Sequence, residues 1–198
     1  MDYNLHLVVI VDPQIDFVTG SLGSEEAKEA VKKIAEKIDF YSEDMRNCNY
    51  KHPVFIFTRD THSVDSYFGT VEGAHLPVAH CFKNTPGWCF VPELYKKSQT
   101  GRALIVEKET FGVNDWRTIV ERKIDIDWGS GSNLKSIEVV GLDTDFCVMA
   151  NAFGLKAAFP NVPITIDAEC CAGSTPEMHE KALDMLEHCH FDVINRNK

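Results

Sequence analysis

Three apolar runs of this sequence are each followed by a side chain that can take part in covalent chemistry: Asp12, Lys108 and Cys147. A thiol with a pKa of about 8.5 is mostly protonated at neutral pH, so a nucleophilic cysteine needs help from its neighbours. A lysine beside it favours the thiolate, and a carboxylate can accept the thiol proton. If the fold brings them together, these three residues are suited to nucleophilic attack on a carbonyl group.

Each of the three residues also has an ordinary structural interpretation. Cysteine is most often a small buried side chain, and the local sequence leaves that alternative and the nucleophile evenly matched for Cys147. Taken alone, Lys108 is typical of a solvated residue at a strand end, and Asp12, which precedes Pro13, is typical of a turn. The catalytic interpretation is favoured because all three residues follow strand ends, where open α/β sheets bind ligands.

A second group of polar residues has the character of metal ligands. Asp60 and His62 lie two apart after the next apolar run, and His80 follows in the same long segment. One carboxylate and two imidazoles suit zinc, iron or manganese and leave positions open for water or substrate. A D-x-H triplet alone is weak evidence, and ordinary loop polarity is the alternative. Further donors within reach by sequence are Glu72, His75 and Cys81.

Apolar, β-branched runs alternate with helical patterns along the chain, and that alternation predicts βαβ units on a parallel sheet. Ser24 is the expected N-cap of the first long helix. Thr175 and Pro176 open the last. The expected strands are 5–11, 54–58, 103–106, 136–140, 162–166 and 191–194, and the expected helices are 24–47, 115–123, 146–159 and 176–190.

Two segments of the chain lack a periodic pattern. Residues 59–100 are expected to be irregular, and a connection of that length inside a compact domain is usually functional. Residues 124–133, with glycines at 129 and 131, have no role that the sequence assigns, and 127–133 is expected to be a surface loop. The whole chain, 1–198, is expected to fold as one domain.

Composition excludes several classes of partner. The formal net charge is −10 and the isoelectric point is near 5.2, which argues against nucleic acid and against an anionic membrane surface. No secretory signal pattern and no apolar stretch of membrane-spanning length is present. The cysteine count, seven, is odd, so free thiols in a cytoplasmic protein are the expectation.

The ordered set of motifs resembles the isochorismatase-like cysteine hydrolases. Its match runs from about residue 7 to 149, and the combination of a cysteine triad with a metal motif looks most like the nicotinamidase (pyrazinamidase) branch. Ile15 and Asn84 depart from the usual asparagine and glycine. The motifs are DPQIDF at 12–17, TRDTH at 58–62, the P-x-x-H-C stretch at 77–85, KETF at 108–111 and GLDTDFCV at 141–148.

The resemblance implies a fold and a set of roles. The fold is a three-layer, Rossmann-like, doubly wound parallel sheet of six strands in the order 3-2-1-4-5-6, with a cis peptide at Leu142–Asp143. The catalytic residues would be Asp12, Lys108 and Cys147, with backbone N–H groups of Asp143 and Cys147 facing the substrate carbonyl. The metal ligands would be Asp60, His62 and His80, with Glu72 as the expected fourth, and the substrate-binding residues Phe17, Tyr67, Asp143 and Phe146.

The activity implied is hydrolysis of nicotinamide to nicotinate and ammonia through a cysteine thioester. One divalent metal ion, zinc or else iron or manganese, would hold the pyridine nitrogen. The partner would be a small carboxamide, and a homo-oligomer is expected because such proteins often assemble as dimers or tetramers.

Other functions remain as alternatives. The first is hydrolysis of another small amide or N-carbamoyl compound, although relatives with those activities generally lack the complete metal set. Isochorismatase activity leaves Cys147 without a covalent role. A nucleotide-binding module is excluded because strand 5–11 is followed by Asp12-Pro13-Gln14 and not by a glycine-rich turn. A catalytically inactive interaction protein on the same fold is disfavoured by the intact triad.

Overall fold

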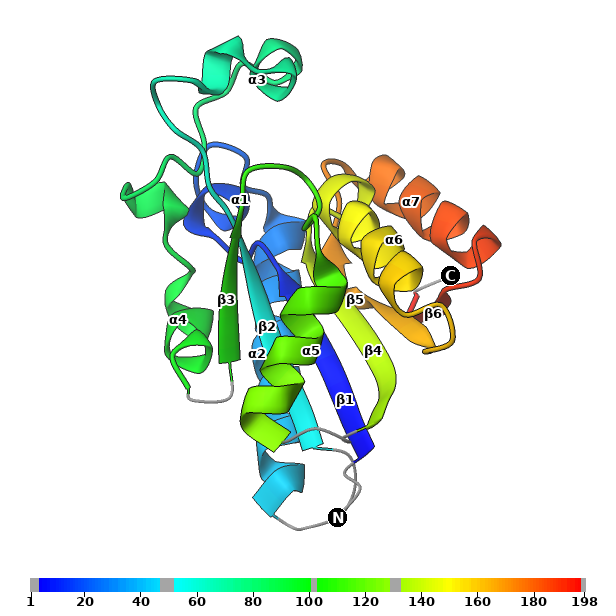
Figure 1. Cartoon of the computed structure of the whole chain (residues 1–198). Coiled ribbons are helices and arrows are strands. Elements are labelled where there is room, and N and C mark those ends of the chain that lie inside the picture. The colour runs from blue at the N-terminus through cyan, green and yellow to red at the C-terminus, as the bar shows by residue number, and fades with distance from the viewer. Residues whose placement is uncertain (1–3, 47–51, 101–102, 129–132, 197–198) are drawn as a thin grey trace.

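A parallel sheet forms the centre of the computed structural model, which describes residues 4–46, 52–100, 103–128 and 133–196 (Figure 1). Its six strands run in the order β3-β2-β1-β4-β5-β6, and every pairing is parallel. Both the strand order and the α/β class agree with the expectation. Because β1 is central, the carboxyl ends of β1 and β4 lie side by side, where ligands of such sheets bind.

Strands β1 to β5 are longer than the apolar runs that predict them, because further residues at their ends also pair, whereas β6 is one residue shorter than expected. Ser24 caps the first long helix, as expected, by accepting a hydrogen bond from the N–H of Ala27 at 3.0 Å. None of the helices in the described part of the chain has the length and apolar character of a membrane span. The strands are β1 (Asn4–Val11), β2 (His52–Asp60), β3 (Ala103–Lys108), β4 (Asn133–Leu142), β5 (Ile164–Ala172) and β6 (Asp192–Ile194). The helices are α1 (Ile15–Val18), α2 (Glu25–Arg46), α3 (Val71–His75), α4 (Pro92–Ser98), α5 (Trp116–Trp128), α6 (Met149–Ala158) and α7 (Pro176–His188), with shorter turns η1 (Tyr67–Gly69), η2 (Pro86–Trp88) and η3 (Thr144–Val148).

Helices cover both faces of the sheet. α5 and α6 lie on the face toward the viewer in Figure 1, and α2 lies behind the strands, where it packs on β4 and β5. The apolar stripe of α2, which includes Val31, Ile34 and Ile38, is buried against the sheet. The result is the three-layer arrangement that alternating strands and helices predict.

Two expectations for the connections were wrong. Residues 59–100 are not structureless, because they contain η1, α3, η2 and α4, and the part that carries η1 and α3 projects beyond the carboxyl end of the sheet (Figure 1). Helix α5 continues to Trp128, so residues 124–128 are helical and not part of a loop. Of the expected 124–133 loop, residues 129–132 lie outside the described residues, and β4 begins at Asn133.

A buried polar cluster lies between α2 and the sheet. It includes His6, the one polar residue of the first apolar run. Glu138 accepts a hydrogen bond from the Tyr41 hydroxyl at 2.6 Å, faces His6 at 3.3 Å and pairs with Lys37, which also reaches Asp167 at 2.5 Å. Burial acts to raise the pKa of Glu138, but His6, Lys37 and Tyr41 outweigh it and hold that pKa at about 2. The cluster therefore depends on an ionised Glu138.

Glu138→Gln is expected to destabilise the protein by about 3 kcal/mol at pH 7, because it leaves Lys37 short of a buried partner. The pKa of Glu138 lies below its ordinary 4.5, so its stabilising effect is present above that pH and is lost as pH falls toward 2. Urea unfolding at several pH values measures this. Glu169→Gln is the control, because Glu169 pairs with Lys33 at 3.7 Å in a solvent-exposed position. Equal losses in the two variants would refute the prediction.

Candidate active site

The carboxyl ends of three strands bring Asp12, Lys108 and Cys147 into contact. Lys108 Nζ lies 2.6 Å from Asp12 Oδ2 and 3.4 Å from Cys147 Sγ. The Asp12 side chain is within hydrogen-bonding reach of the Cys147 thiol. The alternative of a solvated lysine is wrong, because Lys108 is only 5% exposed. A thiol, a carboxylate and an ammonium group therefore share one buried site.

The sheet register explains this meeting. In the pairing of β2 with β3, Lys108 stands opposite Asp60, and its Nζ lies 3.2 Å from Asp60 Oδ1. At the end of β4, Gly141 pairs with Val11 and has a φ of 127°. A Cβ at Gly141 would lie 2.1 Å from the carbonyl oxygen of Val11, so glycine is required for β4 to end this close to β1.

A π-helical turn, η3, carries the thiol. The peptide Leu142–Asp143 that precedes it is cis, as the resemblance implies. The Asp143 carbonyl accepts a hydrogen bond from the N–H of Phe146 at 3.1 Å, which closes the turn. Asn151 of α6 donates to the Cys147 carbonyl at 2.8 Å. These contacts fix the backbone on both sides of Cys147.

Burial dominates the protonation of Cys147 and Asp12. It raises the pKa of Cys147 well above its ordinary value, and the nearby Lys108 ammonium acts in the opposite direction. Burial also raises the pKa of Asp12, again against Lys108. For Lys108 itself, burial lowers the pKa, but Asp12, Cys147 and Asp60 outweigh it and the pKa is raised. The thiol thus keeps its proton until a base removes it, and Asp12 is the base in contact.

Four residues form a group that can hold a metal ion. Asp60, His62, Glu72 and His80 each offer one ligand atom, and these atoms lie within 4.8 Å of one another. His62 Nε2 is 2.8 Å from Asp60 Oδ2 and 3.4 Å from Glu72 Oε1. The group contains all three sequence-predicted ligands and Glu72, whereas His75 lies outside it.

The donor set fits a divalent cation. His62 Nε2 is buried without a hydrogen-bond partner, although it faces two carboxylates. His80 Nδ1 bonds the Val78 carbonyl at 2.9 Å, which leaves Nε2 directed at the same carboxylates. Metal-binding histidines commonly use their second nitrogen in this way. Two imidazoles and two carboxylates suit zinc, iron or manganese.

Two buried polar residues hold the strand ends, and the sequence assigned neither a separate role. Thr58 donates to Asp12 Oδ1 at 2.6 Å and accepts from the Asp12 N–H at 3.1 Å. Gln14 bonds both backbone groups of Asp60, at 2.7 Å and 2.8 Å. Both residues lie inside the DPQIDF and TRDTH motifs, and that position is the one sequence feature that could have indicated their roles. Their spacing could not, because polar residues near strand ends follow no distinctive pattern.

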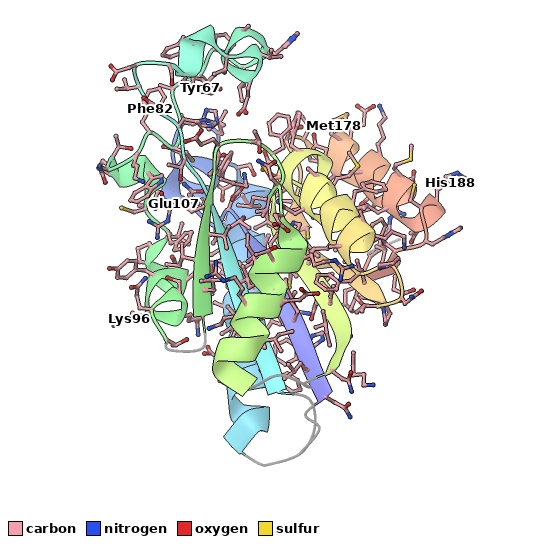
Figure 2. The ribbon with its side chains drawn as sticks, viewed as in Figure 1. Tyr67, Phe82, Lys96, Glu107, Met178 and His188 are labelled. Atoms are coloured by element: carbon pink, nitrogen blue, oxygen red, sulfur yellow. The ribbon has the colours of Figure 1, made fainter. Side chains whose placement is uncertain are left out.

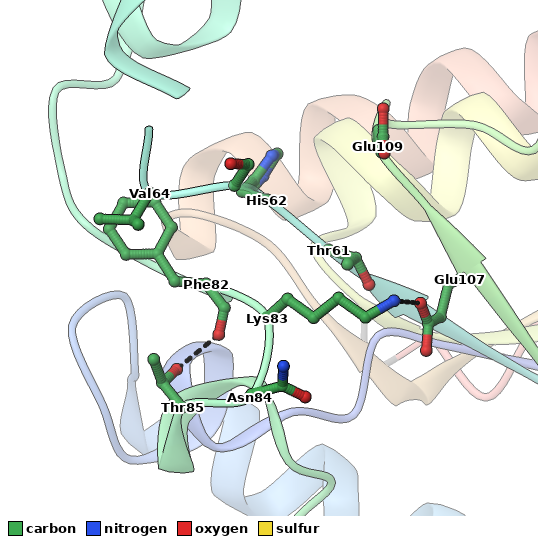
Figure 3. Close-up of a pocket in the computed structure, with 10 residues that line it drawn as sticks. Thr61, His62, Val64, Phe82, Lys83, Asn84, Thr85, Glu107 and Glu109 are labelled. Carbon is green, nitrogen blue, oxygen red and sulfur yellow. Dashed lines mark hydrogen bonds and ion pairs between the residues drawn. The ribbon is translucent and has the colours of Figure 1, made fainter. Parts of the chain in front are cut away.

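One cavity of about 760 Å³ connects the thiol with the metal-capable group. Its lining residues include Cys147, Asp143 and Phe146, and also Asp60, His62, Glu72 and His80. A second hollow of about 470 Å³ is also lined by His62 (Figure 3). Cys147 does not line the second hollow. Two charged residues that do line it, Lys83 and Glu107, pair with each other at 2.6 Å. We therefore place the chemistry in the first cavity.

The aromatic residues expected around the substrate occupy different places. Phe17 lines the cavity with its ring 5.7 Å from that of His80, and Phe146 lines it with its ring packed against that of Phe111, 5.3 Å between ring centres. Tyr67 does not line the cavity: it is buried at the base of the projecting segment, with its ring 4.6 Å from that of His62 (Figure 2). Tyr67 therefore packs against the two histidines of the metal-capable group.

Solved structures of similar fold include three amidases. A pyrazinamidase of Pyrococcus horikoshii in complex with zinc is 23% identical, with 96% of this chain and 99% of that chain covered and a TM-score of 0.72. A pyrazinamidase/nicotinamidase from Streptococcus mutans is 19% identical, with coverage of 96% and 99% and a TM-score of 0.74. An N-carbamoylsarcosine amidase from Thermoplasma acidophilum is 17% identical, with coverage of 96% and 95% and a TM-score of 0.68. At these identities the likeness establishes the fold.

The family assignment rests on the sequence. No curated protein matches this chain. The sequence model of the isochorismatase domain matches residues 6–198, a span that contains every strand end described above. The chain belongs to the isochorismatase family of hydrolases.

Proposed function

We propose that this hydrolase converts nicotinamide to nicotinate and ammonia through a thioester on Cys147. The observation that carries the proposal is the single cavity in which Cys147 and the metal-capable group face the same space. That arrangement suits a small ring with a carboxamide at one end and a ligand nitrogen at the other. The pyrazinamidase and the pyrazinamidase/nicotinamidase among the similar folds support this choice of substrate.

Acylation begins at the carboxamide carbon. Cys147 Sγ forms a bond to that carbon while the thiol proton passes to Asp12. The carbonyl oxygen takes up negative charge, which the backbone N–H groups of Asp143 and Cys147 stabilise. Asp12 then gives its proton to the nitrogen as the carbon–nitrogen bond breaks, and ammonia leaves. Lys108, 2.6 Å from Asp12 and 3.4 Å from the sulfur, balances the charge that moves between them.

Deacylation uses the same groups in a second cycle. A water molecule attacks the thioester carbon and gives a proton to Asp12. The carbon–sulfur bond then breaks, the thiolate recovers the proton from Asp12, and the carboxylic acid is released. Since Asp12 takes and returns one proton in each half-reaction, no net change of the enzyme remains.

Asp60, His62, Glu72 and His80 would hold the metal ion. When bound, a divalent ion supplies a Lewis-acidic position for the ring nitrogen and so fixes the ring in the cavity. Phe17 and Phe146 limit the space for the ring within the same cavity. Orientation of this kind contributes roughly 7 kcal/mol or more to catalysis.

Loss of the metal is expected to lower kcat/KM for nicotinamide by at least about 100-fold, because the ring is no longer oriented. His62→Ala should abolish stoichiometric metal, measured by elemental analysis of the purified protein. His75→Ala is the control, since His75 lines the cavity but stands outside the group of four. Full activity in a protein free of metal would contradict the metal site.

The second candidate activity is hydrolysis of another small amide or an N-carbamoyl compound, which the N-carbamoylsarcosine amidase of similar fold supports. Ammonia release from nicotinamide, pyrazinamide and a panel of carbamoyl compounds separates the candidates. The proposal expects the highest kcat/KM with a pyridine or pyrazine carboxamide. Release from carbamoyl compounds alone would transfer the proposal to the second activity.

A further inference from the structure

The cavity offers no free positive charge to a substrate. Among the described residues that line it there is no lysine or arginine. Lys108 lies beside Cys147, but its side chain is 2% exposed and is paired with the carboxylates of Asp12 and Asp60. His75, an exposed imidazole, is at the rim. With the metal position taken by the ring nitrogen, a substrate carboxylate, which needs a cationic partner, would find none among these residues.

Negative charge, in contrast, is in excess. A divalent ion held by Asp60 and Glu72 balances the charge of those two carboxylates. Two further acidic residues, Asp143 and Glu109, line the same cavity. Coulomb interactions between charges inside such a cavity are several times stronger than in water. The two acids therefore set the sign of the potential that a ligand meets.

Asp143 is the better placed of the two acids. It is four residues before Cys147 and lines the same cavity as the thiol and the metal-capable group, and its carboxyl has no hydrogen-bond or ion-pair partner among the described residues. Burial and the nearby carboxylates of Asp145 and Asp12 raise the pKa of Asp143 to about 7. A partially buried acid without a partner gains most from a ligand that supplies a hydrogen-bond donor or a positive charge.

We propose that the Asp143 carboxyl determines substrate charge: the site accepts neutral or cationic carboxamides and rejects anionic ones such as N-carbamoyl amino acids. The proposal deepens the proposed function, on which it rests. In this proposal Asp143 has two separate roles. Its backbone N–H faces the reacting carbonyl, and its side chain selects the charge on the rest of the substrate.

The experiment measures binding, so that turnover is not required. Metal-loaded Cys147→Ala protein is titrated calorimetrically at pH 8 with nicotinamides that carry an aminomethyl, a methyl or a carboxylate group at ring carbon 5. The cationic ligand is expected to bind at least about tenfold more tightly than the anionic one, a difference of about 1.4 kcal/mol. Adding Asp143→Asn, which keeps the side-chain shape, should remove most of this ratio.

Glu109→Gln is the matched control, because Glu109 lines the cavity from an exposed position where solvent screens its charge. Its effect on the ratio should be small. The proposal is overturned if Asp143→Asn leaves the ratio unchanged, if Glu109→Gln lowers it as much, or if none of the ligands binds. Failure of wild-type protein to release ammonia from nicotinamide would overturn only the proposed function, since the charge ranking is measured without hydrolysis.

Discussion

Cys147→Ala is expected to lower kcat for nicotinamide hydrolysis by at least ~10⁴-fold, because the remaining groups have no nucleophile to act on. The substitution removes one sulfur from the wall of the cavity and leaves the metal-capable group untouched. Binding of nicotinamide, measured by calorimetry, should therefore persist. Loss of turnover with retained binding assigns Cys147 to the chemical step.

Cys89→Ala is the control for this variant. Cys89 is an exposed thiol outside the cavity, so its loss should leave kcat at the wild-type value. Thermal unfolding of both variants checks that the fold is intact. A folded Cys147→Ala protein that still releases ammonia at the wild-type rate would remove Cys147 from the mechanism.

Asp12→Asn should lower kcat by about 10³ to 10⁴-fold, in the range seen when a general base is removed. The reason is the raised pKa of the buried thiol, which stays protonated unless Asp12 takes its proton. Asparagine tolerates the φ of 47° at this position and can still accept the hydrogen bond from Thr58. The fold should therefore survive, and the loss should fall on kcat more than on KM.

Two further measurements make the Asp12→Asn result specific. Metal content should equal that of the wild type, because Asp12 is not one of the four residues that can hold the ion. Alkylation of Cys147 by iodoacetamide should become slower, because deprotonation of the thiol loses its acceptor. A kcat within about tenfold of the wild-type value would show that another group removes the proton.

The strand ends could be predicted from sequence because an apolar run followed by a charged residue marks where a buried strand reaches the edge of the sheet. That rule placed Asp12, Asp60, Lys108 and Cys147 at one edge. Their contacts with one another depend on strand order, which came from the family resemblance and not from any local pattern. Without the order, Asp12 and Cys147 are merely two polar positions 135 residues apart.

The segment 59–100 was predicted poorly for a physical reason. Its helices are three to seven residues long, too short for an apolar stripe to show a period of 3.6. Local signals mark single ends of these elements, such as Thr70 as the N-cap of α3 and Pro92 at the start of α4. The meeting of Glu72 with His80 depends on how these short elements fold back, which no spacing in the sequence specifies.

The electrostatics of the site also required the structure. The sequence suggests that a neighbouring lysine assists ionisation of Cys147, whereas burial raises the pKa of this thiol overall. The partnerless carboxyl of Asp143 could not be recognised either, because the sequence shows which side chains are acidic and not which of them lack a partner. Burial and partnership are properties of the packed site.

The most direct test of the thioester mechanism is intact-protein mass spectrometry of enzyme quenched in acid during turnover of nicotinamide. We expect a mass increase of one nicotinoyl group, placed by fragmentation on Cys147, which disappears when the substrate is exhausted. The same adduct should be absent from Cys147→Ala. Rapid turnover with no adduct on Cys147, together with an active Cys147→Ala variant, would contradict the covalent mechanism.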